Sequence, residues 1–499
     1  MPAGIATTED FYLANRHEFE MLEHFFEARL GVPQEIARDT VKRSILAQVN
    51  EELPRYFDQA PTVSRFWAWY GITAVYFLLQ TLVGRFTPAT LCRDVIFDGW
   101  EIPAIPDFYA RMQKALTSFS TALWVDRNQC TRAEVREFAS PPVCRDVGRR
   151  YNRNTAWRLF KATLTGFPAL RPRPECDRMN LAGLAMRMLK QVLLYETEIA
   201  GLACRAWVSA HDNGYNALRY HVFRRHCAGL VFLIQNGGRV NLASSGNSYI
   251  YCDFYLGWSA MRNIHFHGLC CEGTFEVGSF RLANSMGRPQ LGERRLFDVL
   301  FVEQLCADKQ EPCEFEPDLY LKAVENLVKF AEIHPELRVG YKTLKSRGHD
   351  LHRRAVMPID RLLTGSRVVV DGSLTGDVYE AIARSGVIVA FNSSTRHEAL
   401  MLDRRVLSCN YMQYEYDFLF GDKDAPCVLF SSDYASFEIR LLALLDDANP
   451  ELDAYFSELR PKAGRTSPDT PEKAAAIVRG YLSASALPPA AAKPMAGKA

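Results

Sequence analysis

The stretch GVIVAFNSSTRHEALMLDRRVLSCN (386–410) decides the fold. It opens with a short apolar run, rich in β-branched residues, which is typical of a buried strand ending at Phe391. Polar residues that favour turns and helix starts come next, and they predict a helix over 396–402. RRVLSCN (404–410) then predicts another strand. Strand, helix and strand in so short a stretch form the repeating unit of a parallel sheet.

Similar units extend outward from this stretch. Buried strands are predicted upstream at 296–304, 337–342 and 366–372, and a separate series has strands at 205–211 and 230–235. The segment 277–295 is rich in glycine and polar residues and is typical of an interdomain linker. We therefore expect an α/β protein with two Rossmann-like parallel-sheet domains facing a cleft. The expected boundaries are a mostly helical region at 1–180, domains at 181–285 and 286–483, and a disordered tail at 484–499.

Composition and missing motifs argue against several classes of function. A formal net charge of +1 over 499 residues gives no general attraction to nucleic acid, so no nucleic-acid partner is expected. The 13 cysteines are scattered without zinc spacing, and no metal site is predicted. The GxGxxG fingerprint of dinucleotide dehydrogenases, the Walker A motif and the GxSxG elbow are all missing from the sequence.

Ligands of open parallel sheets bind beyond the carboxyl ends of the strands, so the residues there are the candidates for a site. After Phe391 come four polar residues that offer hydroxyl groups and backbone amides to a phosphate, with Glu398 one turn further: Asn392, Ser393, Ser394 and Thr395. Lys342, Lys345 and Arg347 follow another strand and are candidates for neutralising phosphate charge. The alternatives are a simple helix cap completed by Glu398 and a solvated basic loop.

The first series supplies the opposite wall of the cleft. Asp212 is the first candidate for a base that deprotonates an acceptor hydroxyl, and His211 is the second. An N-cap of the following helix is the alternative for Asp212. Four residues after the next strand are candidates for lining the cleft: Gln235, Asn236, Gly237 and Gly238.

These residues resemble a known family. The segment 382–410 is similar to the donor site of GT-B glycosyltransferases that build bacterial capsule and surface polysaccharides, and 337–342 resembles their lysine-bearing strand. The segments 206–238 and 277–282 resemble their acceptor-side unit and the segment before their linker. Two positions depart from the pattern: Asn236 stands where many relatives carry histidine, and Thr343-Leu344 replace histidine–proline.

The resemblance implies a metal-independent glycosyltransferase without a cofactor, which moves a sugar from a nucleotide sugar to a glycan or lipid-linked acceptor. It also implies that Ser393, Ser394 and Thr395 hold the donor phosphate, that Glu398 binds ribose and that Lys342 offsets phosphate charge. Three alternatives are a sugar-nucleotide epimerase, a glycerophosphotransferase on the same fold and a non-catalytic binding or assembly protein.

The apolar stretch Phe66–Val83 bears on localisation. It carries no charge and approaches the length of a membrane span, but polar residues interrupt it, which favours a buried or interface helix. We expect a cytoplasmic protein, with peripheral contact to the cytoplasmic face of a membrane as an additional option.

Overall fold

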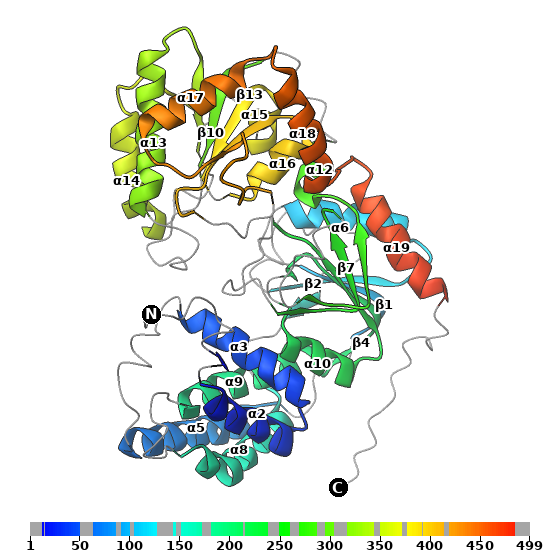
Figure 1. Ribbon diagram of the computed structural model, residues 1–499. Coiled ribbons are helices and arrows are strands. Elements are labelled where there is room, and N and C mark those ends of the chain that lie inside the picture. The colour runs from blue at the N-terminus through cyan, green and yellow to red at the C-terminus, as the bar shows by residue number, and fades with distance from the viewer. Residues whose placement is uncertain are drawn as a thin grey trace.

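The computed structural model describes most of the chain, and structural statements below refer to these residues: 12–13, 15–49, 63–85, 91–99, 104–126, 143–145, 151–171, 181–212, 215–237, 249–259, 269–286, 295–303, 317–343, 350–371, 377–391, 393–413 and 419–484. They form three parts, with a helical unit at the bottom of Figure 1, a first sheet in the middle and a second sheet domain at the top.

The first sheet is parallel throughout, with the strand order β3-β2-β1-β4-β5-β7-β9. Its central pair, β1 and β4, lies in a register that sets Phe97 beside Val208. A further pair, β6 and β8, forms a small separate sheet. The strands are β1 (Leu91–Asp98), β2 (Thr121–Asp126), β3 (Val143–Arg145), β4 (Leu202–Ser209), β5 (Leu230–Ile234), β6 (Ile250–Tyr251), β7 (Phe254–Gly257), β8 (Leu269–Cys270) and β9 (Gly273–Glu276).

Helices cover both faces of the first sheet because successive strand residues point to opposite sides. On one face, Val95 and Phe97 pack with the helices α6 (Ala104–Ala115), α12 (Phe280–Met286) and α19 (Thr470–Ala484). On the other face, Ile96 and Trp207 pack against residues of α10 (Ala217–His226). The result is a three-layer sandwich of helices, sheet and helices, which is the architecture of a Rossmann-like domain.

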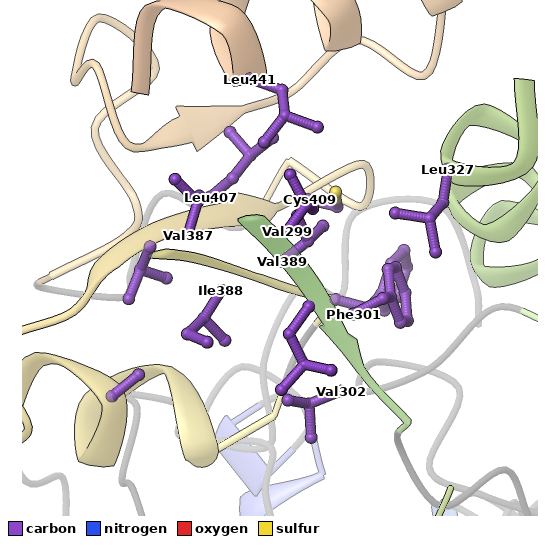
Figure 2. Close-up of a cluster of buried hydrophobic side chains, with 14 of the residues drawn as sticks. Val299, Phe301, Val302, Leu327, Val387, Ile388, Val389, Leu407, Cys409 and Leu441 are labelled. Atoms are coloured by element: carbon purple, nitrogen blue, oxygen red, sulfur yellow. The ribbon is translucent and has the colours of Figure 1, made fainter. Parts of the chain in front are cut away.

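The second sheet is also parallel and has the strand order β12-β11-β10-β13-β14-β15. Figure 2 shows side chains from β10, β13 and β14 meeting those of the covering helices in its core. The strands are β10 (Phe297–Val302), β11 (Val339–Lys342), β12 (Val369–Asp371), β13 (Ser385–Ala390), β14 (Arg405–Cys409) and β15 (Val428–Leu429). The helices are α13 (Pro317–Ile333), α14 (Asp350–Leu363), α15 (Val378–Ala383), α16 (Thr395–Met401), α17 (Tyr434–Leu445) and α18 (Pro450–Ala463).

The helical unit has its own apolar core, which includes Phe26, Phe77 and Leu189. It consists of α2 (Arg16–Leu30), α3 (Gln34–Val49), α5 (Val63–Val83), α8 (Arg153–Gly166), the 3-10 turn η1 (Phe167–Leu170) and α9 (Leu181–Ile199). Ala217 and Leu218 at the start of α10 complete this core, so α10 joins the helical unit to the first sheet.

The predicted fold class is confirmed: two Rossmann-like parallel sheets and a helical N-terminal region are present. The expected boundaries differ from the structure at two places. Strands β1, β2 and β3 lie within 1–180, so the first sheet begins well before residue 181. Helix α19 lies within the predicted second domain but packs on the first sheet, where Val478 and Leu482 enter its core. The tail beyond residue 484 lies outside the described residues.

Candidate functional site

The carboxyl ends of the two sheets meet at the domain interface. Gly237 follows β5 and Ser394 follows β13, and a Cβ atom built on Gly237 would lie 3.8 Å from the Ser394 Oγ. Beside them, the rings of Trp258 after β7 and His397 on α16 lie 6.4 Å apart between centroids. Two segments that sequence reasoning assigned to opposite walls of one site are therefore neighbours.

The turn after β13 is organised by its own hydroxyl groups. Thr395 donates from its Oγ1 to the Ser393 Oγ at 2.8 Å, and its backbone N–H points to the same oxygen at 3.3 Å. Arg396 is buried and donates hydrogen bonds to the Ser393 carbonyl and to the Ser408 Oγ. These two bonds connect the turn to β14. Within the described part of the chain, the Ser394 hydroxyl makes no hydrogen bond. Asn392 lies outside the described residues.

Glu398 has structural hydrogen bonds that its sequence context did not predict. It is 2% exposed, and its Oε1 accepts hydrogen bonds from the Ser279 hydroxyl at 2.6 Å and the Tyr379 hydroxyl at 2.9 Å. Burial raises the pKa of Glu398, while the two hydroxyls and the charge of Arg281 act in the opposite direction. The carboxylate joins α16 to the segment that enters the second domain, and both hydroxyls bind the same oxygen, Oε1. The predicted contact of Glu398 with a ribose stays a prediction. It does not complete a capping box.

Lys342 ends β11 in a buried ion pair. Its Nζ lies 3.2 Å from the Asp371 Oδ2 at the end of β12, and the two side chains are 8% and 0% exposed. Glu303, directly after β10, is also buried and accepts a hydrogen bond from the Tyr341 hydroxyl at 3.2 Å. Three neighbouring strands thus end in buried charged groups. The other basic candidates, Lys345 and Arg347, lie outside the described residues.

On the first sheet, Asp212 is fully buried and accepts a hydrogen bond from the Tyr255 hydroxyl at 2.8 Å. It is not the cap of α10, because Asn216 caps that helix through a hydrogen bond from the Arg219 N–H. His211 is half-buried and precedes it at the end of β4. Between the two candidates for a base, His211 is the more accessible.

The residues after β5 make contacts of different kinds. Gln235 is fully buried and binds the backbone of Gly237 and Trp258, which fixes the ends of β5 and β7 together. The Asn236 Oδ1 accepts a hydrogen bond from Arg281 on α12 at 2.5 Å. Gly238 lies outside the described residues.

Sequence reasoning missed several polar residues that build this interface. Ser279, Arg281 and Tyr379 connect the carboxyl ends of the two sheets, and Thr466 accepts the Ser279 backbone N–H at 2.8 Å. A signal existed for two of them, since Ser279 and Arg281 lie in the segment 277–282 that resembles the family pattern. Tyr379 and Thr466 carried no local signal, because their role depends on contacts far along the chain.

Two general features complete the description. Among the described residues, no group of three His, Cys, Asp or Glu side chains is arranged to hold a metal ion. Helix α5 contains one window, Phe66–Val83, that is long and apolar enough to cross a membrane, and 22% of this window is buried.

The comparisons with known proteins concern the fold. No family model matches the sequence, and no curated protein matches it. Solved structures that are similar include a glycosyltransferase from Rickettsia africae, with 10% identity, a TM-score of 0.42, and coverage of 79% of this chain and 100% of that chain. The wall teichoic acid polymerase TagF has 12% identity, a TM-score of 0.43, and coverage of 84% and 98%.

A UDP-GlcNAc 2-epimerase from Neisseria meningitidis bound to UDP-GlcNAc has 10% identity, a TM-score of 0.40, and coverage of 78% and 99%. All three TM-scores lie below 0.5.

Proposed function

We propose that this protein is a glycosyltransferase that moves a sugar from a nucleotide-activated donor to a glycan or lipid-linked acceptor in surface polysaccharide biosynthesis. The donor would bind at the carboxyl end of the second sheet and the acceptor at that of the first. The observation that carries the proposal is the approach of Gly237 to Ser394, which brings the two candidate binding edges together. A transfer reaction needs this arrangement, because the donor and the acceptor must meet at one point.

The chemistry assigned to the site is a single transfer. The acceptor oxygen attacks the anomeric carbon, the bond from that carbon to the donor phosphate breaks, and the nucleotide leaves with the electron pair. His211 is our choice for the group that takes the acceptor proton, since Asp212 is fully buried. Hydroxyl groups of Ser393, Ser394 and Thr395 would hold the phosphate, and basic side chains would stabilise its charge without a metal ion.

A second candidate is a nucleotide-binding protein without transferase activity. It is favoured by the burial of Asp212, Lys342 and Glu398, each of which already has a partner within the protein. An epimerase or a glycerophosphotransferase would use the same edge of the second sheet, but the epimerase would need no acceptor.

The test is thermal stabilisation of the full chain by CMP, CDP, UDP and GDP, with and without a chelator. A nucleotide at a hundred times its dissociation constant should stabilise the protein by about 2.7 kcal/mol. Ser394→Ala is the informative variant, because the hydroxyl has no partner among the described residues and its removal should leave the unliganded protein intact. Ser457→Ala, at an exposed position of α18 in the same domain, is the matched control.

We expect one nucleotide to stabilise the wild type and the Ser457→Ala variant strongly and the Ser394→Ala variant weakly. Stabilisation equal in both variants would mean that the nucleotide binds elsewhere. No stabilisation by any nucleotide would contradict a nucleotide-dependent function altogether. With the donor class known, release of labelled sugar to a lipid-linked acceptor separates a transferase from an epimerase and from a binding protein.

We also propose that the protein works at the cytoplasmic face of a membrane. The solvent side of α5 is a continuous apolar stripe of large side chains, each at least 38% exposed: Trp67, Ile72, Val75, Leu78, Leu79, Leu82 and Val83. Trp157 and Leu164 on the adjacent α8 extend it, and Lys161 lies over the Trp157 ring at 5.8 Å. Exposed tryptophan beside lysine is suited to the boundary between lipid headgroups and acyl chains.

A further inference from the structure

A pocket rich in arginine lies at the amino-terminal edge of the second sheet, opposite the edge proposed for the nucleotide. Its volume is about 510 Å³, a size typical of small-molecule sites. Two aspartates, Asp403 and Asp447, also line it. The arginines, which we call the arginine pocket, are Arg295, Arg384, Arg404, Arg405 and Arg460.

Part of this concentration has a structural cause. Helices of a Rossmann-like domain run against the strands, so their carboxyl ends gather at this edge and attract cations. Arg405 fits this role, because it donates to the carbonyl oxygens of Leu444 and Asp446 at the end of α17 and to Asp453 at 2.8 Å. Arg384 is likewise bonded to Glu380 at 3.1 Å. Arg460 donates to the carbonyl oxygen of Asp403, just beyond the end of α16, at 3.1 Å. Arg295 and Arg404 are not explained in this way.

Nearby acids neutralise Arg295 and Arg460 only loosely. Arg295 lies 3.6 Å from Asp447 and 3.4 Å from Asp298, and Arg460 lies 3.5 Å from Asp403. Asp447 and Asp403 are 79% exposed, and Asp298 is 30% exposed. Ion pairs so exposed contribute little and are weakened further by salt. The arginine charges are therefore available to a ligand that approaches from solvent.

Arg404 is the most informative member. Its side chain is half-buried, no hydrogen bond or ion pair to another described residue holds its guanidinium, and its Nε is buried without an acceptor. Burial lowers the pKa of Arg404, and the charges of Arg295 and Arg460 add to the lowering while Asp403 opposes it. The two Nη atoms also have no hydrogen-bond partner among the described residues, and unlike Nε they are not buried. An anion from solvent could therefore accept hydrogen bonds from them.

The backbone also makes room for this arrangement. A Cβ atom built on Gly386, at the start of β13, would lie 1.7 Å from the Arg295 Nη2. Any other residue would force that guanidinium to shift from its present position. Gly386 therefore permits the approach of Arg295 to Arg404, which like charges alone would oppose.

We propose that the arginine pocket is a binding site for a multivalent phosphate anion, either inorganic pyrophosphate or the diphosphate of a nucleotide. Guanidinium groups match phosphate oxygens in geometry and charge, and the Arg404 Nη atoms contribute donors that have no acceptor among the described residues. This site is separate from the proposed nucleotide site at the other edge of the sheet. It stands or falls independently of the proposed transferase function.

The experiment is calorimetric titration of the full chain with inorganic phosphate, pyrophosphate and UDP at fixed ionic strength. Arg404→Gln should weaken pyrophosphate binding about tenfold or more, as loss of a charge-assisted hydrogen bond requires. Arg440→Gln is the matched control, since it removes the same charge from a half-buried position of α17 outside the pocket. Arg404→Lys keeps the charge, so it should bind with intermediate affinity if the protein is correctly folded.

The site is supported if pyrophosphate binding is saturable, and if Arg404→Gln weakens this binding while Arg440→Gln does not. If UDP binding is weakened in parallel, the ligand is a nucleotide diphosphate; if it is unaffected, the ligand is the inorganic anion. The proposal is overturned if the wild type shows no saturable binding, or if the two variants bind pyrophosphate equally well. Thermal unfolding of each variant without ligand checks that the fold is retained.

Discussion

At the scale of single residues, Glu398 connects segments of the two domains, and its predicted contact with a ribose stays a prediction. Its carboxylate accepts the hydroxyls of Ser279 and Tyr379, which come from the linker segment and from α15. A buried carboxylate gains little by being charged unless its hydrogen bonds compensate for lost hydration. The stability of the interface should therefore depend on the protonation state of this one group.

Glu398→Ala should lower the free energy of unfolding by about 1–3 kcal/mol, because two buried hydroxyls lose their acceptor. Burial raises the pKa of Glu398 in the native state above its unfolded value of about 4.3. At pH values between these two pKa values, the native state binds more protons than the unfolded state. The free energy of unfolding should fall as the pH rises through this window, and Glu398→Gln should abolish the fall. Urea unfolding at a series of pH values measures both effects.

Glu458→Ala serves as the control, since this residue lies exposed on α18 and should change neither stability nor its pH dependence at those values. An identical pH profile for wild type and Glu398→Gln would show that the carboxylate does not titrate in the native state over this range.

The positions of the site residues at the strand ends could be predicted from the sequence, but the contacts of their side chains could not. Ser394 and Gly237 were expected on facing edges because the rule that ligands bind at strand ends depends only on strand positions. The burial of Asp212 could not be predicted, because it depends on Tyr255, which comes from another strand. Local patterns specify strand ends, whereas burial depends on long-range packing.

At the scale of elements, the turn between α18 and α19 is closely packed against the first domain. Gly464 has a φ of +110°, and a Cβ atom built on it would lie 2.0 Å from the Trp258 carbonyl oxygen. Backbone atoms cannot yield as a flexible side chain can. Position 464 therefore requires glycine for two reasons: its positive φ and the nearby carbonyl oxygen of Trp258.

Gly464→Ala should destabilise the protein by about 1–3 kcal/mol, the usual cost of a strained backbone conformation. Gly480→Ala is the matched substitution: Gly480 is exposed within α19 with nothing within 4 Å of a built Cβ, so helix propensity should stabilise the protein by about 0.5–1 kcal/mol. Thermal unfolding monitored by circular dichroism measures both changes. Equal effects of the two substitutions would show that the contact with Trp258 is not restrictive.

Strong local patterns explain which elements could be predicted. Strands β10 and β13 each contain four consecutive apolar residues, VLFV (299–302) and VIVA (387–390), and both strands were found close to their observed bounds. Strand β1 was missed because its sequence, LCRDVIFD, mixes charged and apolar residues. The place of α19 on the first sheet could not be predicted, since it is decided by contacts with α6 and Phe254 far away in the sequence.

At the scale of the whole molecule, the helical unit lies at the end remote from the second domain (Figure 1). Its helix α5 carries the apolar stripe. Ile72→Asp/Leu79→Asp should abolish sedimentation with vesicles containing anionic lipid, because two charges would enter the apolar stripe. Both side chains are more than half exposed, so the fold should tolerate the change. Co-sedimentation with vesicles measures binding.

Ile439→Asp is the control, because Ile439 is a large exposed residue on α17 and does not belong to the stripe. Membrane contact through α5 is excluded if the wild type remains in the supernatant, or if both variants lose binding to the same extent.

The return of α19 to the first sheet also concerns the synthesis of the protein. Tyr481 packs against Phe232, Phe254 and Phe275, which leave the ribosome long before it. About 200 residues separate β9 from the end of α19, and at ~5–20 residues per second their translation takes roughly 10–40 s. Throughout this interval the nascent first sheet lacks the helix whose Tyr481 packs against these three rings. We therefore expect the nascent chain to be most prone to aggregation before α19 emerges, because apolar surface exposed during folding favours association.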